Sequence, residues 1–326
     1  MKITTNPNFA KGIFPVLFSL LLVSGYSVNA QQKEPVYIPQ IDAKWWQVAG
    51  DPDLGKYTNP KQEPVDFGVW QAADGTWQLW SCIRNTKCGG MTRLFYRWQG
   101  ASLLDSDWKP MGIAMEADTS FGEVAGGLQA PYVMKIGKEY NMFYGGWHDI
   151  CLAKGMDGKT FARQLLPNSK SIMFSEGLKS NTRDVMVIKK GNLYYAYYTA
   201  YKGKNGFDFV RTSKDLKTWS PSTIVAGGGS AGDGPWSAEC PFVYFHKPSG
   251  YYYLFRTQFY GEKAKTSVYR SKDLMNFGVN DDNYLVTTLP VAAPEIIDHE
   301  GQLYIAVLLP NLKGIQIAKL SFVAKN

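Results

Sequence analysis

The sequence is poor in the residues on which zinc and histidine chemistry depend. Only three histidines and four cysteines occur in 326 residues, and no Cys-x-x-Cys pair or histidine cluster is present. Structural and catalytic zinc sites need such groups of ligands, and a histidine-based catalytic triad has little material. We therefore expect no metal or other cofactor in catalysis, while a structural calcium ion stays open.

A long apolar run, as a membrane-spanning helix needs, is also missing. The apolar stretch "IFPVLFSLLLV" follows Lys2 and Lys11 and is well short of the ~20 residues of a comfortable span. It ends in "SVNA", with small residues at Val28 and Ala30. This pattern predicts a signal peptide over residues 1–30, cleaved after Ala30, and export to the periplasm or the extracellular space. A retained N-terminal anchor is the alternative.

Strong charge of one sign is absent from the remaining chain. Removing Lys2 and Lys11 from the 35 Lys and Arg leaves 33, against 28 Asp and Glu. A surplus this small is not the basic stripe of a nucleic-acid-binding protein, and we expect neither nucleic acid nor a membrane as partner. It permits an anionic substrate such as a uronate or a sulfated glycan, although a solvated surface explains it equally well. We expect a monomer.

The four cysteines gain meaning from the expected export. Cys82 and Cys88 flank the loop "IRNTK", and we expect them to lie within the ~7 Å between Cα atoms that a disulfide requires. Cys151 and Cys240 fit a buried, apolar role as readily as a bond.

The chain is rich, in contrast, in aromatic residues interleaved with glycine and proline, and no convincing amphipathic helix follows residue 30. A unit of a short strand, a glycine turn, an aromatic strand and a third strand recurs from positions 65, 129, 183, 239 and 293. The third and fourth copies share "RTSKDLKTW" and "RSKDLMNF". Five such units predict an all-β, five-bladed β-propeller that forms a single domain over residues 31–326. Whether the fifth blade takes a strand from the N-terminal segment stays open.

Polar residues stand at the start of the strand that should be innermost in each blade. These residues are Asp66, Gln129, Asp184, Glu239 and Glu295. Carboxylates that line an aromatic-walled channel mouth do not serve stability, because burial of a charge costs several kcal/mol unless it is paired. Cleavage of a glycosidic bond needs this arrangement: one carboxylic acid protonates the leaving oxygen, and a second carboxylate attacks the anomeric carbon or activates water.

The order of these residues resembles the five-bladed propeller glycoside hydrolases of families 32 and 43. Arg183-Asp184 resembles the "RDP" element, and Glu239-Cys240-Pro241 resembles the "ECP" element. The resemblance covers nearly the whole mature chain. It implies that Glu239 is the acid/base, that Asp66 is the nucleophile or base, and that Asp184 stabilises the transition state or orients the acid.

The sequence also departs from both families. The family-32 signature Asn-Asp-Pro-Asn-Gly is replaced by "PVDFGVW", Asp184 is followed by Val185 instead of proline, and the family-43 acid usually stands in Glu-Gly-Pro. The chain therefore resembles an outlying branch. The Glu-Cys-Pro element favours retention of configuration, whereas the altered first-blade motif weakens that inference, so retention and inversion both stay open.

Further residues are candidates for contact with the sugar. For Trp147 a core position is an equal alternative, Arg183 could simply pair with Asp184, and for Arg256 a structural ion pair is the preferred interpretation. The candidate substrate-binding residues are Arg183, Gln129, Trp147, His148, Trp236 and Arg256.

The residues thus predict an exported glycoside hydrolase that acts on furanosides or related sugars of plant or algal polysaccharides and oligosaccharides. A non-catalytic glycan-binding propeller is one alternative, and a transglycosylase that uses the same carboxylates is another. The sugar, the linkage and endo or exo action do not follow from the residues.

Overall fold

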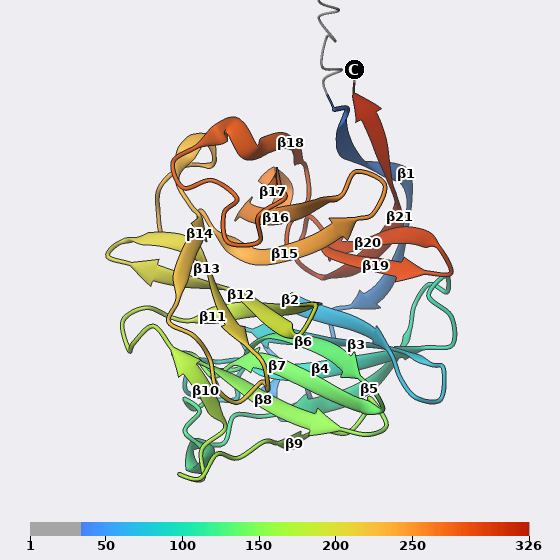
Figure 1. Cartoon of the computed structure of the whole chain (residues 1–326). Coiled ribbons are helices and arrows are strands. Elements are labelled where there is room, and N and C mark those ends of the chain that lie inside the picture. The colour runs from blue at the N-terminus through green and yellow to red at the C-terminus, as the bar shows by residue number, and fades with distance from the viewer. Residues whose placement is uncertain (1–33, 326) are drawn as a thin grey trace, which may run out of the picture. The chain divides into compact units, whose positions relative to one another are not determined.

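Five antiparallel sheets follow one another around the propeller in the computed structural model, which describes residues 34–325 (Figure 1). The prediction of an all-β, five-bladed propeller is confirmed. The predicted signal peptide lies outside the described residues.

The first two blades are built from consecutive strands. Blade one contains β2 (Glu63–Gln71), β3 (Trp77–Arg84), β4 (Leu94–Gly100) and β5 (Lys109–Met115). Blade two contains β6 (Gln129–Ile136), β7 (Glu139–Gly145), β8 (Asp149–Gly155) and β10 (Ile172–Ser175), with β9 (Ala162–Arg163) paired to β8.

The third and fourth blades have the same order. Blade three contains β11 (Arg183–Lys190), β12 (Leu193–Lys202), β13 (Asn205–Ser213) and β14 (Thr223–Ala226). Blade four contains β15 (Glu239–His246), β16 (Tyr251–Phe259), β17 (Lys265–Ser271) and β18 (Leu285–Leu289).

The fifth blade joins the two ends of the propeller. Its strands are β19 (Glu295–His299), β20 (Gln302–Leu308), β21 (Gly314–Lys325) and β1 (Val36–Gly50). Strand β1 is antiparallel to β21, from Val36 opposite Lys325 to Gly50 opposite Gly314, so the blue and red ends of the chain run side by side in Figure 1. The N-terminal segment therefore supplies the outer strand of blade five. This pairing covers the sheet edge that a three-stranded blade would leave exposed.

The inner strands share a backbone irregularity close to where each of them begins. A residue with positive φ stands at the same place in all five blades: Asp66 (39°), Ala130 (41°), Asp184 (56°), Cys240 (48°) and Ala293 (49°). In four blades it coincides with a register shift against the second strand. Positive φ costs a non-glycine residue on the order of 1–3 kcal/mol. A bulge of this kind redirects two successive side chains out of the regular alternation.

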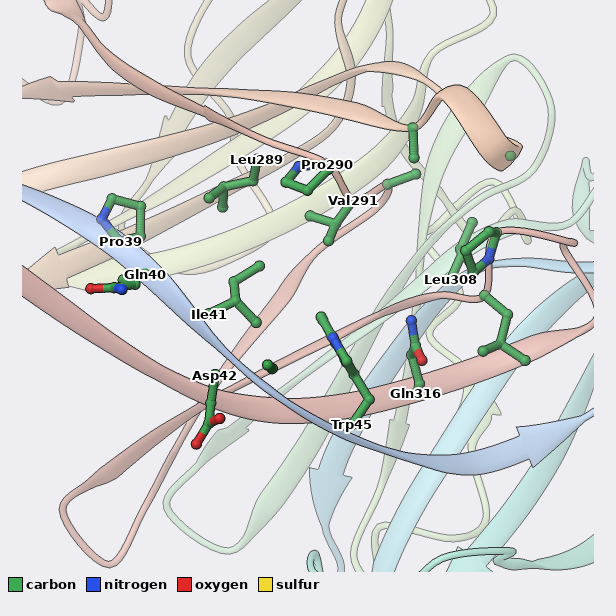
Figure 2. Close-up of a pocket in the computed structure, with 16 residues that line it drawn as sticks. Pro39, Gln40, Ile41, Asp42, Trp45, Leu289, Pro290, Val291, Leu308 and Gln316 are labelled. Carbon is green, nitrogen blue, oxygen red and sulfur yellow. The ribbon is translucent and has the colours of Figure 1, made fainter.

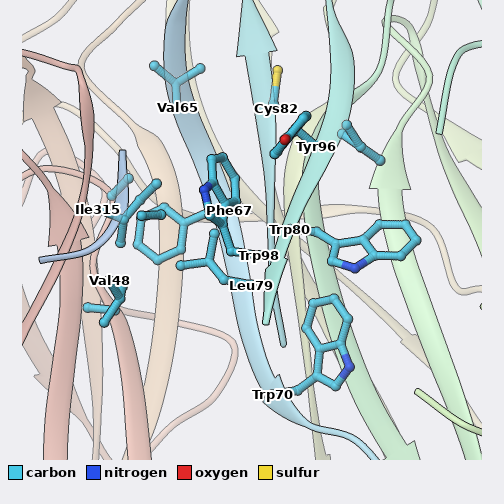
Figure 3. Packing of buried hydrophobic residues seen from close by; sticks show 14 of the residues in the cluster. Val48, Val65, Phe67, Trp70, Leu79, Trp80, Cys82, Tyr96, Trp98 and Ile315 are labelled. Carbon is cyan, nitrogen blue, oxygen red and sulfur yellow. The ribbon is translucent and has the colours of Figure 1, made fainter. Parts of the chain in front are cut away.

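The blades are held together by large apolar side chains between neighbouring sheets. The cluster in Figure 3 includes Phe67 and Leu79 of blade one together with Val48 and Ile315 of blade five, all buried. Between blades one and two, the Trp80 and Phe161 rings meet edge to face with centroids 5.3 Å apart. Aromatic content at the inner and middle strands thus reflects packing between blades.

Cys82 and Cys88, which we expected to lie close enough for a disulfide, do not form one. All four cysteines are free thiols. The buried Cys82 thiol donates to the Leu128 carbonyl oxygen at 3.3 Å, whereas the Cys88 thiol points to the Arg93 carbonyl oxygen at 3.5 Å. The spacing in sequence was suitable, but β3 directs the Cys82 side chain into the core (Figure 3).

Helical structure within residues 34–325 is limited to five short 3₁₀ turns. These are Gly55–Tyr57, Thr119–Phe121, Gly229–Ala231, Gly261–Lys263 and Asp282–Tyr284. None of these turns has the length and apolar character needed to cross a membrane.

Candidate active site

A pocket of about 480 Å³ opens where the inner strands of blades one to four begin. Asp66, Gln129, Arg183 and Glu239 line it, one from the inner strand of each of these blades. Trp147, His148 and Trp236 from connecting segments also line it, so seven of the nine predicted site residues belong to its lining. Only Asp184 and Arg256 lie elsewhere.

The bulges explain how neighbouring residues reach different spaces. Gln129, Arg183 and Glu239 precede the positive-φ residue and line the pocket. The positive-φ residues Asp184 and Cys240 line a narrow space of about 20 Å³, to which the first residues of all five inner strands contribute. Asp66 lines both spaces. In blades three and four the bulge therefore lets two successive polar side chains, Arg183 and Asp184 or Glu239 and Cys240, face the pocket and the channel space.

Arg183 connects the carboxylates of blades three and four. Its Nη2 donates to Glu239 Oε1, and its Nε lies 3.6 Å from Asp184 Oδ2. The guanidinium also lies over the Tyr201 ring, 4.8 Å from the centroid. The Asp184 carboxylate accepts in addition the backbone N–H of Cys240 at 3.2 Å. These contacts fix the Glu239 side chain against the strand that precedes it in the propeller.

Burial and mutual repulsion shift the ionisation of the two carboxylates in contact with Arg183. Burial raises the pKa of Glu239, and the Asp66 carboxylate adds to the rise, although Arg183 opposes it. Burial together with Asp66 and Glu239 raises the pKa of Asp184 to about 8. Close carboxylates cannot all ionise in a poorly solvated site, so one of them holds a proton at neutral pH. The site can thus offer both a protonated carboxyl group and a carboxylate.

Asp66 is held by the thiol of Cys240, which in turn contacts a phenol. The Cys240 thiol donates to Asp66 Oδ1 at 3.3 Å, and the Tyr260 hydroxyl lies 3.2 Å from the same sulfur. Tyr260 follows β16 and lines the pocket. The Cys240 side chain in the Glu-Cys-Pro element therefore orients the carboxylate of another blade, which the sequence alone did not suggest.

Trp147 stands in the bend between β7 and β8 with φ of 89°. Its position depends on Gly127, because a Cβ there would lie only 2.9 Å from the Trp147 Cβ. The Arg93 guanidinium lies over the Trp147 ring, 5.2 Å from the centroid. The neighbouring His148 also lines the pocket, and its Nδ1 is buried without a hydrogen-bond partner among the described residues.

Trp236 stands at the pocket rim with 59% of its surface exposed. Its ring meets Tyr201 edge to face at 6.1 Å, and the Arg183 guanidinium lies 5.9 Å from its centroid. An exposed indole beside polar groups provides a flat surface suited to the apolar face of a sugar ring. Gln129, in contrast, is 1% exposed, and its Oε1 has no hydrogen-bond partner in the described part of the chain.

Arg256 does not reach the pocket. Its side chain is fully buried, and it donates to the carbonyl oxygens of Ser237 at 2.7 Å and Gly228 at 3.3 Å. Asp208 Oδ2 lies 4.0 Å from its Nε. Its assignment to substrate binding is therefore corrected to the structural ion pair that was the preferred alternative. Arg256 stands in β16 beside Thr257, the residue opposite Glu239, but its side chain is directed to Ser237, Gly228 and Asp208 in the interior.

Glu295 lines the narrow channel space instead of the pocket. Burial raises its pKa well above the ordinary value. It therefore lies apart from the pocket that Asp66 and Glu239 share.

Several pocket residues carried no signal in the sequence. Arg84 ends β3 and Arg93 precedes β4, while Lys179, Asn181 and Tyr201 stand near the ends of blade-three strands. Whether these residues reach the pocket depends on which loops meet at the mouth of the propeller channel. The small excess of basic over acidic residues in the sequence was the one general indication of Arg84, Arg93 and Lys179.

A second pocket of about 430 Å³ lies between β1 and the segment that follows β18 (Figure 2). Ile41, Trp45, Leu289 and Val291 contribute to its mainly apolar lining, and Asp42 is its one carboxylate. The two pockets are similar in volume, so chemistry distinguishes them. A site for acid-base chemistry needs more than one convergent ionisable group, and the pocket with Asp66 and Glu239 has them.

Metal ligands are not grouped in the described chain. Over residues 34–325, no three or more His, Cys, Asp or Glu side chains are arranged to hold a metal ion.

Comparison with known proteins finds similarity in structure alone. No family model and no curated protein matches the sequence. A thermostable family-43 glycoside hydrolase superposes with a TM-score of 0.60 at 16% identity, covering 83% of this chain and 96% of that chain. An endo-1,4-beta-xylanase of Bacteroides thetaiotaomicron gives 0.60 at 15% identity, covering 82% and 96%. The catalytic domain of a family-62 alpha-L-arabinofuranosidase of Coprinopsis cinerea gives 0.57 at 11% identity, covering 85% and 97%.

Identities this low establish the fold and leave the chemistry to the residues of the site. The order of the strand-start residues in the sequence resembled that of propeller glycoside hydrolases, and the arrangement of the blades agrees with that resemblance. The chain has the five-bladed propeller fold of the family-43-like glycoside hydrolases.

Proposed function

We propose that the protein is a glycoside hydrolase that cleaves O-glycosidic bonds in plant or algal polysaccharides or oligosaccharides. The observation that carries this proposal is that Asp66 and Glu239, from different blades, line one pocket with Arg183 and exposed Trp236. Two carboxyl groups across a sugar-sized, aromatic-walled pocket are what hydrolysis of a glycoside requires. The known folds it resembles belong to enzymes named as xylanases and arabinofuranosidases.

In this proposal Glu239 is the acid that protonates the leaving oxygen. Its raised pKa, caused by burial and by Asp66, favours the protonated form that an acid needs. Asp66, held by the Cys240 thiol, is the partner across the scissile bond and acts as nucleophile or as base. Asp184 and Arg183 are positioning residues, because they hold Glu239 in place and set its electrostatic surroundings.

The sugar-binding roles follow from position. Trp236 and Trp147 would stack on sugar faces, while Gln129 and His148 have buried polar atoms without partners that substrate hydroxyls could satisfy. We also propose that residues 1–30 direct export to the periplasm or beyond, and that the mature protein acts as a monomer. The N-terminal sequence pattern supports the first of these.

The primary test is a screen of aryl furanosides and pyranosides together with polysaccharides, with wild type and Glu239→Ala. We expect the variant to lose turnover of unactivated glycosides by orders of magnitude, since the acid acts in the transition state. Wild-type activity in Glu239→Ala would refute the assignment. A protein that binds the polysaccharides and leaves them intact would be a glycan-binding propeller, and products longer than the substrate would indicate a transglycosylase.

Stereochemistry has a separate test in Asp66→Ala with added azide. If Asp66 is a nucleophile, azide replaces it and gives a glycosyl azide of inverted configuration, as a retaining enzyme predicts. If Asp66 activates water, the wild type inverts, and NMR of the first-formed anomer shows this directly.

A further inference from the structure

The pocket carries more positive than negative groups. Arg84, Arg93, Lys179 and Arg183 line it, against the carboxylates of Asp66 and Glu239. A neutral polysaccharide does not need this imbalance. The question is which of the cations are already neutralised within the protein.

Two of the four cations have carboxylate partners. Arg183 is paired with Glu239 and lies 3.6 Å from Asp184. Arg84 Nε lies 2.6 Å from Glu63 Oε2, and this pair is half-buried. Neither guanidinium is therefore free to take a full ion pair with a ligand.

Arg93 and Lys179 are different. Among the described residues, neither side chain has a carboxylate within ion-pair distance. Arg93 is half-buried and rests on the Trp147 ring at 5.2 Å, whereas Lys179 is exposed at the rim. The ring contact orients the guanidinium, and partial burial strengthens its attraction for an anion. Lys179, on an exposed segment, can attract the same anion from a distance.

We propose that the pocket takes an anionic sugar, whose uronate carboxylate or sulfate ester pairs with the Arg93 guanidinium. This inference rests on the proposed function and adds the substrate class. The guanidinium is a planar fork of donors that matches the oxygens of a carboxylate or a sulfate. The sugar ring then lies near Trp147, which shares the same arginine.

An alternative role for Arg93 is to offset the charge of the two pocket carboxylates. That role would affect every substrate equally, because it acts on the reacting groups. An anion receptor affects only charged ligands. The two roles therefore differ in a measurable way.

Binding measurements on matched oligosaccharides test the inference independently of catalysis. The probes are oligogalacturonides with their carboxyl-reduced counterparts, and sulfated galactan oligosaccharides with their desulfated counterparts. Calorimetry or ligand-observed NMR on the whole mature chain gives the affinity for each. We expect the acidic member of at least one pair to bind ten-fold or more tightly than its neutral counterpart at low salt. The pair that responds distinguishes carboxylate from sulfate.

Arg93→Gln should abolish most of the preference for acidic ligands and leave the affinity for neutral ligands unchanged. Arg93→Lys should retain part of the preference for acidic ligands. Lys319→Gln, an exposed residue of β21, removes one positive charge away from the pocket and serves as the control. Equal affinity within both pairs, or no binding of either acidic member, would overturn the inference. The inference would also be overturned if Arg93→Gln lowered the affinity for acidic and neutral ligands by the same factor.

Hydrolysis of the same oligosaccharides is recorded separately. Selective binding that depends on Arg93 without any cleavage would refute the proposed hydrolase and leave the anion site standing. Cleavage with no preference for the acidic member would refute the anion site alone.

Discussion

Two buried arginines, Arg183 and Arg256, show how the same chemistry serves two different purposes in this propeller. Arg183 is 3% exposed and contacts Glu239 and Asp184, and Arg256 is 0% exposed and lies beside Asp208. Arg183 stands at the first residue of β11, next to a bulge, and lines the pocket. Arg256 stands within β16 and touches only protein.

The difference lies in what each ion pair faces. The pair formed by Arg183 and Glu239 borders a pocket and leaves Glu239 accessible to a substrate, so its charges can take part in chemistry. The pair formed by Arg256 and Asp208 is sealed, and both Asp208 carboxylate oxygens lack hydrogen-bond partners among the described residues. We infer that the first pair supports activity at some cost in stability, and that the second affects the fold alone.

The largest expected effect is on turnover at the first pair. Glu239→Gln should lower kcat by ~10²–10⁴-fold, the usual contribution of a general acid. The amide keeps the shape of the side chain and an acceptor oxygen for Arg183, so the variant should stay folded, with a lower melting temperature because Arg183 loses its ionised partner. Asp208→Asn is the matched control and should leave kcat within a few-fold. Similar losses of kcat in both variants would remove the functional distinction between the two pairs.

The next effect is on stability at the second pair. Arg256→Met leaves Asp208 buried without its partner and should reduce the free energy of unfolding by about 3–5 kcal/mol. Replacing both residues, as Asp208→Leu with Arg256→Met, should restore most of the loss, because a well-packed apolar pair is often neutral. Denaturant unfolding followed by fluorescence measures both variants. An Arg256→Met variant as stable as wild type would show that the sealed pair contributes little.

Measuring the free energy of unfolding as a function of pH compares the sites of Asp184 and Asp208 in one experiment. Burial raises the pKa of Asp184 to about 8 and of Asp208 to about 7, whereas an unfolded aspartate titrates near 3.9. Between these limits the folded protein binds more protons than the unfolded chain, so stability should fall as pH rises from about 4 to about 8. Each group contributes a slope of up to about 1.4 kcal/mol per pH unit within its window.

Single variants separate the two contributions. Asp184→Asn should flatten the decline up to about pH 8, and Asp208→Asn should flatten it up to about pH 7. Unfolding free energies from pH 4 to pH 9 decide this. A stability that rises over this range in the wild type would contradict the assigned direction of both shifts.

The sequence predicted the fold well because its signals are local and repeated. The inner strands β6, β11 and β15 begin at Gln129, Arg183 and Glu239, the residues from which the repeat was counted. The outer strand of blade five could not be assigned, because β1 pairs with a strand almost 300 residues away in the sequence, and pairing at that distance leaves no local pattern.

The site was predictable where it coincides with the repeat or stands close to a strand end, as Trp147, His148 and Trp236 do. Asp66, Gln129, Arg183 and Glu239 stand at strand starts and were found. Arg93 and Tyr260 come from segments between strands, where no periodicity marks a residue that reaches the mouth. Arg256 was misplaced because an arginine inside a strand gives no sign of whether it faces a pocket or a sealed core.

The smallest expected effect concerns the thiol that orients Asp66. Cys240→Ala removes the donor to Asp66 Oδ1 and the contact with the Tyr260 hydroxyl, while Arg183 and Glu239 keep their own pairing. A thiol is a weak donor, and loss of such a hydrogen bond costs about 0.5–1.5 kcal/mol, so kcat should fall by roughly two- to ten-fold. KM should stay the same, because the thiol lines the narrow channel space and not the pocket. Tyr260→Phe removes only the hydroxyl that contacts the Cys240 sulfur and should have the smaller effect on kcat. If Cys240→Ala lowers the melting temperature and leaves kcat unchanged, the thiol belongs with Arg256 among the groups that serve the fold.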